Sequence, residues 1–472
     1  MAVEFVSVFD IFKIGVGPSS SHTLGPWKAS MDFRNQLALH KVRFIGIELY
    51  GSLSKTGRGH GTDIAIMLGL SGYNPIDIDT SQIKHYLDII EEEKCINLIN
   101  GKVDYKYTTS FSFNNTSLPY HPNAMTLKAE LENGQFIEQT YYSVGGGFIE
   151  KEGDLFQKES DLLSKIPYPI SSEKQLIDFI NRTDLPIWKL VLHNELALNP
   201  LSEIENKIDN IWQTMKECMY NGCHSEGYLP GGLHVKRRAE SINKKLLQNV
   251  KYDSLEDWIA CIKASPQSFD NINQWISCFA LAVNEENASF GRIVTSPTNG
   301  AAGIIPAVLM YYYCFNDIQG ENILYRYFFT ASEIGSLFKK GATISAAAGG
   351  CQAEVGVSAA MAAAGLTELK GGSPKQVLIA AEIAMEHHLG LTCDPVGGLV
   401  QIPCIERNAI GAMKAISACN LALNTDPDSA RVKLDDVIKT MWQTAQDMNQ
   451  KYRETAEGGL AINISQDIIP NC

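Results

Sequence analysis

The chain has 472 residues, of which 45% are hydrophobic and 20% are charged, and its formal net charge is −13. This length exceeds the roughly 250–300 residues at which single hydrophobic cores stop growing, so we expect two domains. The acidic balance disfavours nucleic acid and anionic membrane as partners and leaves a small molecule as the expected ligand. The opening residues "MAVEFVSVFD" lack the basic and apolar regions of a signal peptide, so we expect a cytoplasmic protein.

The first distinctive motif is Gly17–Thr23, which reads GPSSSHT. A Gly-Pro corner followed by hydroxyl side chains is typical of a helix N-cap, here for the helix that carries Trp27 and Met31. One hydroxyl is enough for a cap, and the others have no part in it. A second interpretation therefore stays open, in which the remaining hydroxyls and the histidine bind a small charged molecule at the same helix end.

The segments that follow predict short strands mixed with helices. Val42–Leu53 is rich in β-branched and aromatic residues and predicts a strand. Ala124–Leu131 and Phe136–Ile149 alternate like the two arms of a hairpin, with Glu132–Gly134 as its turn. Gly59–Leu70 predicts a helix that follows polar residues. The amino-terminal third of the chain is therefore expected to be an α+β domain.

The composition changes at Lys151–Lys174, which is charged, contains two prolines and shows no sustained strand pattern. Such a stretch is typical of a domain boundary. From about Ser172 onwards helical periodicity dominates. We therefore expect an α+β domain over residues 1–160 that contributes active-site loops, a linker over 161–175, and a larger all-α catalytic domain over 176–472.

The segment most like a membrane span is Gly341–Leu366, which is nearly uncharged. It consists of Ala, Gly and Ser instead of Leu and Ile, and Glu354 lies in its middle. These residues favour an internal helix, with its entry loop, packed tightly among other helices over a helix that crosses a bilayer.

The chain contains 11 cysteines, an odd number without an export signal, so we expect no disulfides. Most lie in apolar helical patterns and are interpreted as buried core residues. Cys351, Cys393 and Cys404 differ, because glycine or proline next to each interrupts regular structure. Their spacing matches neither a zinc knuckle nor a ferredoxin run, so a metal site and an ordinary loop stay open as alternatives. Three thiolates without a fourth ligand would leave one coordination position for a substrate.

Five motifs in order give the chain a resemblance to a known family. They are GPSSSHT, GHGTD at Gly59–Asp63, TSPTNGAAG at Thr295–Gly303, GGCQAEVG at Gly349–Gly356 and CDPVGGLVQIPCIERN at Cys393–Asn408. Together they resemble the iron–sulfur L-serine dehydratases over nearly the whole chain. The resemblance implies a 4Fe-4S cluster held by Cys351, Cys393 and Cys404. It also implies conversion of L-serine to pyruvate and ammonia without pyridoxal phosphate.

Within this resemblance, His60 is the favoured base for the α-proton of serine, and His22 competes for that role. Asp63 is near enough in sequence to orient His60. The alternative is that Gly59–Gly61 is only a turn whose neighbours Thr62 or Asp63 cap the next helix. Within the same resemblance, we expect the substrate to be bound by side-chain and backbone groups of Ser19, Ser20, Ser21, Thr23, Asp63, Thr298, Asn299 and Gly300.

Cys472, the last residue, is interpreted as a possible fourth ligand of the cluster in the absence of substrate. Two other functions stay open: a pyridoxal-phosphate-dependent serine/threonine dehydratase, and a non-catalytic binding module stabilised by zinc. Threonine is not excluded as a substrate, because one methyl group is worth only about 1–3 kcal/mol of discrimination. A homodimer is the expected assembly, since it is the commonest among soluble proteins.

Overall fold

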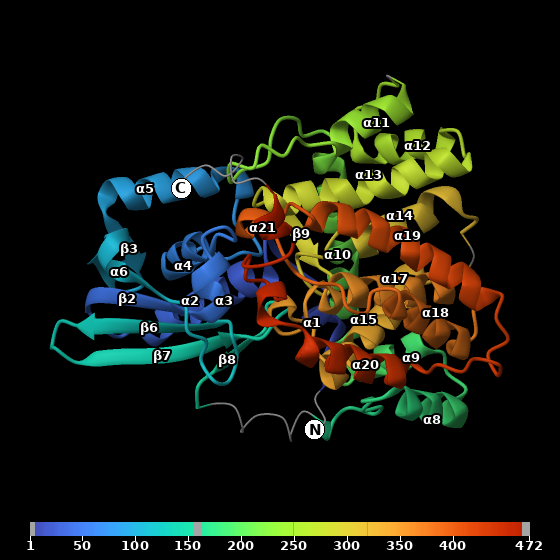
Figure 1. Cartoon of the computed structure of the whole chain (residues 1–472), viewed down its shortest axis with the longest axis horizontal. Helices are drawn as coiled ribbons and strands as arrows, with labels where there is room; N and C mark the ends of the chain where they lie inside the picture. The colour runs from blue at the N-terminus through green and yellow to red at the C-terminus, as the bar shows by residue number, and fades with distance from the viewer. Residues whose placement is uncertain (1–4, 154–162, 249, 319, 465–472) are drawn as a thin grey trace.

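The structure is a computed structural model, and it describes residues 5–153, 163–248, 250–318 and 320–464. Figure 1 shows a sheet-containing amino-terminal part on one side and a larger helical part on the other. The fold class predicted from the sequence, an α+β part followed by a larger helical part, is confirmed.

The amino-terminal part contains most of the strands. The strands are β1 (Lys13–Val16), β2 (Val42–Tyr50), β3 (Cys95–Leu98), β4 (Gly101–Asp104), β5 (Phe111–Asn114), β6 (Ala124–Leu131), β7 (Phe136–Ser143) and β8 (Ile149–Lys151). The helices are α1 (Val8–Ile11), α2 (Gly25–Gln36), α3 (Gly51–Thr56), α4 (Thr62–Leu70), α5 (Ile83–Glu93) and α6 (Tyr107–Ser110), with a π-helical turn at Ser20–Leu24 and a 3₁₀ turn at Thr80–Gln82.

The main sheet has five strands in the order β5-β2-β6-β7-β8, and only β2 and β5 run parallel. The predicted hairpin is present as β6 and β7, joined through Gly134 in a left-handed conformation. Along β2 the buried residues Ile45, Ile47 and Leu49 alternate with partly exposed ones, so one face of the sheet is covered. Helix α2 packs on that core through Phe33.

The helical part follows. Its helices are α8 (Glu173–Thr183), α9 (Ile187–Leu196), α10 (Leu201–Gly222), α11 (Ala239–Leu247), α12 (Leu255–Ala264), α13 (Phe269–Ala288), α14 (Ile304–Phe315), α15 (Ile323–Gly341), α16 (Ala346–Gly349), α17 (Val355–Leu369), α18 (Pro374–Glu386), α19 (Cys404–Leu423), α20 (Leu434–Asp447) and α21 (Leu460–Asn463). Short 3₁₀ turns lie at Cys351–Ala353, Val396–Gly398 and Gln450–Tyr452, and one strand, β9, at Arg292–Thr295.

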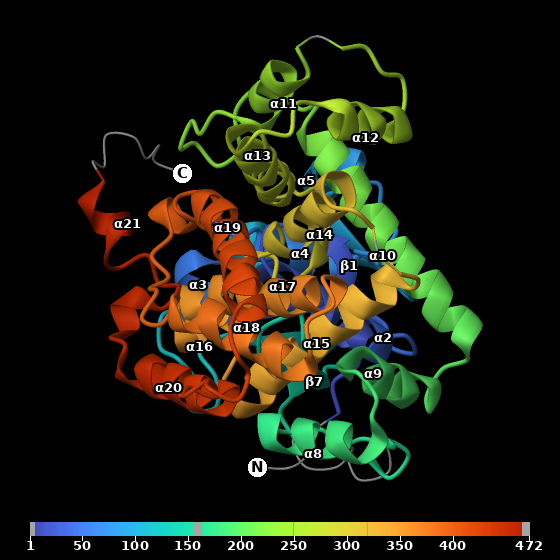
Figure 2. The same ribbon diagram turned by 90° about the vertical axis from the view of Figure 1, so that its right-hand side faces the viewer.

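Helix α17 lies in the middle of this part, in contact with α14, α15, α18 and α19 (Figure 2). All of its residues are buried. Its small side chains let neighbouring helices approach closely: a methyl group at Gly365 would lie 2.7 Å from the ring of Tyr327. The predicted internal helix is therefore confirmed for this stretch. No helix among the described residues is long and apolar enough to cross a membrane.

An amino-terminal arm, made of α1 (Val8–Ile11) and β1 (Lys13–Val16), contacts the helical part. Strand β1 pairs antiparallel with β9 of the helical part, with Lys13 opposite Thr295. Val8, Ile11 and Phe12 of the arm are buried in the core of the helical part, where the Phe12 ring packs against Phe328. The first helical turn therefore packs into the core of the helical part, whereas Val16 at the end of β1 packs with Trp27 in the amino-terminal part.

Candidate active site

The two histidine motifs of the amino-terminal part are held together by reciprocal hydrogen bonds. The Thr23 hydroxyl donates to the carbonyl of His60 at 2.7 Å, and the Thr62 hydroxyl donates to the carbonyl of His22 at 2.6 Å. The two imidazole rings lie 4.5 Å apart, and both are buried. Ser19 caps the π-helical turn by accepting from the His22 backbone N–H at 3.1 Å. The cap predicted for the helix of Trp27 and Met31 lies one turn earlier, on the π-helical turn that leads into α2, whereas α2 itself begins after Leu24 without a side-chain cap. The motif also positions the His22 side chain.

The two ring nitrogens of His60 have different environments, and only Nδ1 makes a hydrogen bond in the described structure. Its Nδ1 lies 3.0 Å from the carbonyl oxygen of Thr56, which can only accept, so Nδ1 carries the proton. The unprotonated Nε2 faces Glu454, whose Oε1 is 4.0 Å away. Burial lowers the pKa of His60 to about 4. The ring is therefore a neutral base with its lone pair directed into the site.

His22 has the opposite arrangement. Its Nε2 lies 3.1 Å from the hydroxyls of Ser52 and Thr56. Those hydroxyls donate their hydrogens to the carbonyls of Glu454 and Ser52, so Nε2 of His22 must be the donor. Its Nδ1 is 3.0 Å from the Ser21 hydroxyl. Burial, and then the neighbouring His60, keep the pKa of His22 well below its usual value.

The three loop cysteines come together from the helical part. Cys351 starts a 3₁₀ turn, Cys393 pairs with Arg453 in a short bridge, and Cys404 begins α19. A hydrogen bond from the Cys393 thiol lowers the pKa of Cys351 to about 7 despite burial. The pKa of Cys393 is raised by that same contact and by burial. Burial and the Cys351 thiolate raise the pKa of Cys404.

This donor set fits an iron–sulfur cluster. Thiolates are the usual ligands of such clusters, and here three buried sulfurs need a shared positive charge before all can ionise. Within the described ranges, no three His, Cys, Asp or Glu side chains are arranged to ligate a single metal ion. A cluster binds each thiolate at a different iron, so its ligands need not converge on one atom. Cys472 lies outside the described residues.

Arg407 supports the cysteines, and sequence reasoning missed it. Its guanidinium donates to the Thr392 carbonyl at 2.6 Å and contacts Asp394 Oδ1 at 3.2 Å. It also stabilises the Cys351 thiolate, which contributes to the lowered pKa of that cysteine. The available signal was its position three residues after Cys404, on the same face of a predicted helix.

Two buried carboxylates, also missed, face the cysteines. Burial and the nearby Cys351 raise the pKa of Glu354 to about 8. Glu354 lies against the TSPTNG loop, where a methyl group on Gly300 would come within 2.7 Å of its Oε2. Burial and Glu354 raise the pKa of Glu454 well above its usual range. Glu354 carried a signal, since it is an acidic residue inside a nearly uncharged segment and a family motif, whereas Glu454 lies outside every motif.

Polar atoms without partners mark where a ligand can bind. The buried polar atoms that lack a well-formed hydrogen bond among the described residues include the hydroxyls of Ser20 and Thr298 and Oε2 of Glu454. Buried polar atoms are normally bonded, so these three are available to a bound molecule. The hydroxyls of Ser19 and Ser21 lie 3.3 Å apart and already serve the His22 loop.

Two predicted site residues have structural partners instead. The side chain of Asn299 accepts from Thr295 and donates to the Val16 carbonyl, so it ties the TSPTNG loop to β1. Asp63 accepts from the Tyr107 hydroxyl at 3.0 Å. The expectation that Asp63 orients His60 is wrong, because the Thr56 carbonyl holds that ring.

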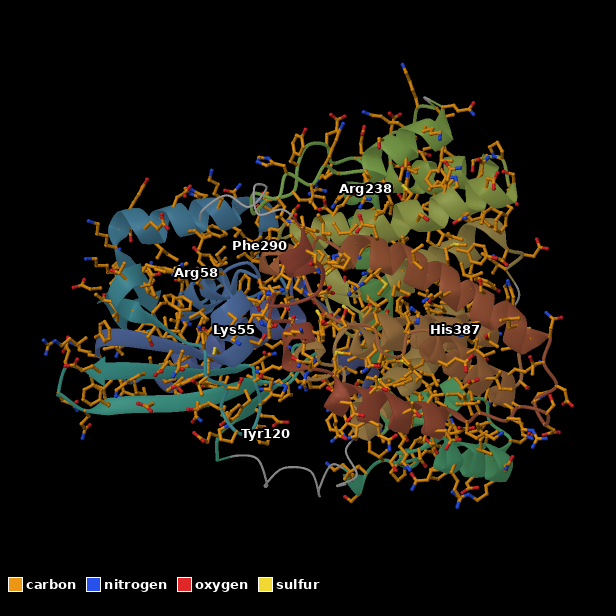
Figure 3. The ribbon with its side chains drawn as sticks, viewed as in Figure 1. Lys55, Arg58, Tyr120, Arg238, Phe290 and His387 are labelled. Carbon is orange, nitrogen blue, oxygen red and sulfur yellow. The ribbon has the colours of Figure 1, made fainter. Side chains whose placement is uncertain are left out.

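A cavity of about 660 Å³ lies where the two parts meet. Its lining includes Lys55, Arg58 and Phe290, which Figure 3 labels at this junction. Gly59 lines it too, and a methyl group there would lie 2.7 Å from the Gly398 carbonyl oxygen. Only glycine therefore lets the His60 loop approach the loop between Cys393 and Cys404 so closely.

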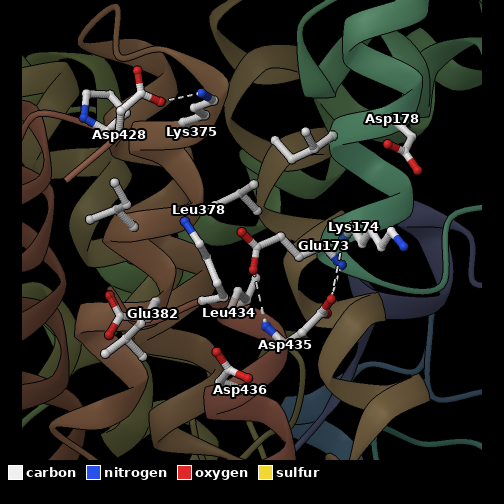
Figure 4. Close-up of a pocket in the computed structure, with 15 residues that line it drawn as sticks. Glu173, Lys174, Asp178, Lys375, Leu378, Glu382, Asp428, Leu434, Asp435 and Asp436 are labelled. Atoms are coloured by element: carbon white, nitrogen blue, oxygen red, sulfur yellow. Dashed lines mark hydrogen bonds and ion pairs between the residues drawn. The ribbon is translucent and has the colours of Figure 1, made fainter. Parts of the chain in front are cut away.

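A second cavity, of about 480 Å³, lies among α8, α18 and the segment leading to α20 (Figure 4). Some of its charged groups have partners within the protein. Lys375 contacts Asp428 at 2.6 Å, and Glu173 and Asp435 accept from each other's backbone N–H groups. None of the residues that the sequence singled out lines this cavity.

Comparison with known proteins matches both parts of the chain. Residues 7–154 match the family model described as serine dehydratase beta chain, and residues 182–461 match serine dehydratase alpha chain. "L-serine dehydratase 1" of Escherichia coli is 47% identical over 98% of this chain and 100% of its own length. "L-serine dehydratase 2" of the same organism is 48% identical over 97% and 99%, and the "L-serine dehydratase" of Streptomyces coelicolor is 46% identical over 97% and 99%.

Proposed function

Because this chain belongs to the serine dehydratase family and is a lyase, we propose that it converts L-serine to pyruvate and ammonia. We further propose that Cys351, Cys393 and Cys404 hold a 4Fe-4S cluster. The observation that supports the proposal most strongly is the position of His60, a neutral histidine whose Nε2 lies 4.0 Å from Glu454. The backbone N–H of Glu454 in turn donates to the carbonyl of Cys393, so the histidine and the cysteine loop share one neighbour where the beta-chain and alpha-chain regions join.

The reaction removes the α-proton and the β-hydroxyl of serine, and neither leaves easily near neutral pH. When bound, the cluster supplies an iron with an open position, which acts as a Lewis acid toward the leaving hydroxyl. His60 takes the α-proton at Nε2, the nitrogen that the Thr56 hydrogen bond leaves unprotonated. The aminoacrylate that results tautomerises to an imine, which water hydrolyses to pyruvate and ammonia.

His22 is the weaker candidate for the base, since its Nε2 already donates to hydroxyl groups. We propose that it positions Ser21 and the adjacent loop. The substrate carboxylate is then bound by donors of the Ser19–Thr23 loop and by Thr298 and Gly300 of the facing loop. The Thr298 hydroxyl is buried beside Glu354, and it can donate either to that carboxyl or to a bound carboxylate.

An anaerobic assay of pyruvate formation tests the function. The freshly purified protein should be brown, bleach in air and release pyruvate from L-serine. D-serine and L-threonine, assayed alongside, define the substrate preference. A yellow chromophore sensitive to hydroxylamine would indicate the pyridoxal-phosphate enzyme instead. One zinc without iron or sulfide, and no turnover, would indicate the binding module.

Other expectations from the sequence stand as proposals with their own tests. A cytoplasmic homodimer is checked by cell fractionation and by analytical ultracentrifugation, and the domain limits 1–160, 161–175 and 176–472 by limited proteolysis. For Cys472 as a resting-state ligand, deletion of this residue should alter the cluster spectrum in the absence of serine. An unchanged spectrum and activation lag would reject that role.

A further inference from the structure

L-serine carries three polar groups, and the proposed function accounts for two of them. The carboxylate and the hydroxyl have donors or a Lewis acid, but the α-ammonium group needs an acceptor. Both histidines at the site are kept neutral and buried, so a cation bound here is out of contact with bulk water. A cation in such a place is stable only beside an anionic partner.

Glu454 has the geometry of that partner. Its Oε1 lies 3.5 Å from His22 Nδ1 and 4.0 Å from His60 Nε2, while its Oε2 is buried without a hydrogen-bond partner. In the part of the chain that the structure describes, these two imidazoles are the only basic side chains within 4.0 Å of its carboxylate oxygens. Both imidazoles are neutral and burial raises the pKa of Glu454, so the carboxyl has no protein cation beside it that would keep it ionised. A bound ammonium group would supply that positive charge.

The backbone of Glu454 adopts an unfavourable conformation that its contacts hold in place. Its φ is 56°, in the left-handed region that residues other than glycine rarely adopt. Its N–H donates to the Cys393 carbonyl at 2.9 Å, and its carbonyl accepts from the Ser52 hydroxyl at 2.9 Å. One contact comes from the cysteine loop and the other from the amino-terminal part, so the carboxylate is positioned by both halves of the site.

We propose that Glu454 binds the α-ammonium group of the substrate and thereby selects α-amino acids over hydroxy acids. This inference rests on the proposed function. The ammonium nitrogen is bonded to the carbon that loses its proton. A charge-assisted hydrogen bond of about 2.7–2.9 Å to Glu454 therefore places that carbon beside Nε2 of His60, which lies 4.0 Å from the same carboxylate.

Glu354 is the competing carboxylate. It lies against Gly300 and Thr298, on the loop assigned to the substrate carboxylate, and two anions there would repel each other. Glu454 instead lies beside the base. The two assignments predict different variants to lose recognition of the amino group.

The test compares two ligands that differ only in the amino group: L-serine, and 3-hydroxypropionate, which is serine without it. In the anaerobic holoenzyme, E454Q should raise the KM for L-serine about 10-fold to 100-fold, since a hydrogen bond to a charged group contributes about 1.5–3 kcal/mol. The inhibition constant of 3-hydroxypropionate should stay within about twofold. E454D, which keeps the charge, should recover part of the loss.

E457Q is the matched control, because Glu457 lies on the same segment and pairs with Lys55 at the surface. It should leave both constants unchanged. Iron and sulfide content and the melting temperature are measured for every variant, and E454D decides the question if E454Q does not retain its cluster.

Three results would overturn the assignment: equal losses for both ligands, a fall in kcat with an unchanged KM, or a serine-selective loss in E354Q instead of E454Q. Absence of pyruvate formation by the wild type would instead overturn the proposed function. The two failures therefore give different results.

Discussion

Replacement of His60 by asparagine tests the roles of its two ring nitrogens separately. The asparagine amide superimposes on Nδ1 and can still donate to the Thr56 carbonyl, but the basic Nε2 is lost. The matched change is His22→Gln, whose amide superimposes on Nε2 and can still donate to the hydroxyls of Ser52 and Thr56. The first variant removes the proposed base, and the second retains the hydrogen bond that we assign to its neighbour.

A positioned general base contributes about 10²-fold to 10⁴-fold to the rate. At 1.36 kcal/mol for each tenfold change, His60→Asn should therefore raise the barrier by about 3–5 kcal/mol. His22→Gln should lower kcat by less than about tenfold. Because burial holds the pKa of His60 at about 4, the base is neutral throughout the physiological range. The wild-type kcat/KM should then be insensitive to this group between about pH 8 and about pH 6.

The assay is anaerobic pyruvate release from L-serine, with the visible absorption of the cluster recorded for each protein. His60→Asn should keep the absorption and lose turnover. A His60→Asn enzyme within about tenfold of the wild-type kcat would refute the role of His60. So would a His22→Gln enzyme as inactive as His60→Asn, since the proposed division of roles would then be wrong.

Arg407→Met should shorten the lifetime of the cluster and raise the pKa of Cys351, because the guanidinium stabilises that thiolate; iron release to a chelator and the pH dependence of thiol alkylation in the iron-free protein measure the two effects. Thr23→Val should lower the free energy of unfolding by about 1–3 kcal/mol, since it leaves the buried carbonyl of His60 without its donor, and denaturant titration checks this. Burial lowers the pKa of His388 to about 4, below the value near 6.5 of an unfolded chain, so stability is complete above about pH 6.5 and falls by about 3 kcal/mol as the pH drops toward 4. The melting temperature of His388→Gln should change less with pH across that range than that of the wild type. An equal change in both proteins would contradict this assignment.

The sequence predicted those parts of the fold that depend on local chemistry. The alternation in Ala124–Leu131 and Phe136–Ile149 predicted the hairpin, and the small residues after Gly341 predicted a buried helix. The strand predicted to reach Leu53 ends at Tyr50, because Gly51 adopts a positive φ and begins α3. Pairing of β1 with β9 was out of reach, since no local pattern links strands so far apart in the chain.

The candidate site shows the same division. His60 and the loop cysteines stand out by nearby glycine or proline, and His22 stands out by the hydroxyl residues around it, so those residues could be chosen from the sequence. Their partners could not, because the Thr56 carbonyl that orients His60 is a backbone group common to every residue type. Glu454 lay outside every motif. Its importance depends on contacts with Ser52 and Cys393, which only the folded chain brings together.

The amino-terminal arm has a consequence for the order in which the molecule forms. Strand β1 is synthesised first, yet its partner Arg292–Thr295 and the core around Phe328 leave the ribosome much later. The main sheet of the amino-terminal part can fold as soon as it emerges, because its strands pair with one another. The arm cannot, and its contacts span a large sequence separation, which slows their formation. The GPSSSHT loop follows directly after the arm, so the candidate active site is assembled only when most of the chain is complete. A nascent fragment therefore lacks the assembled site.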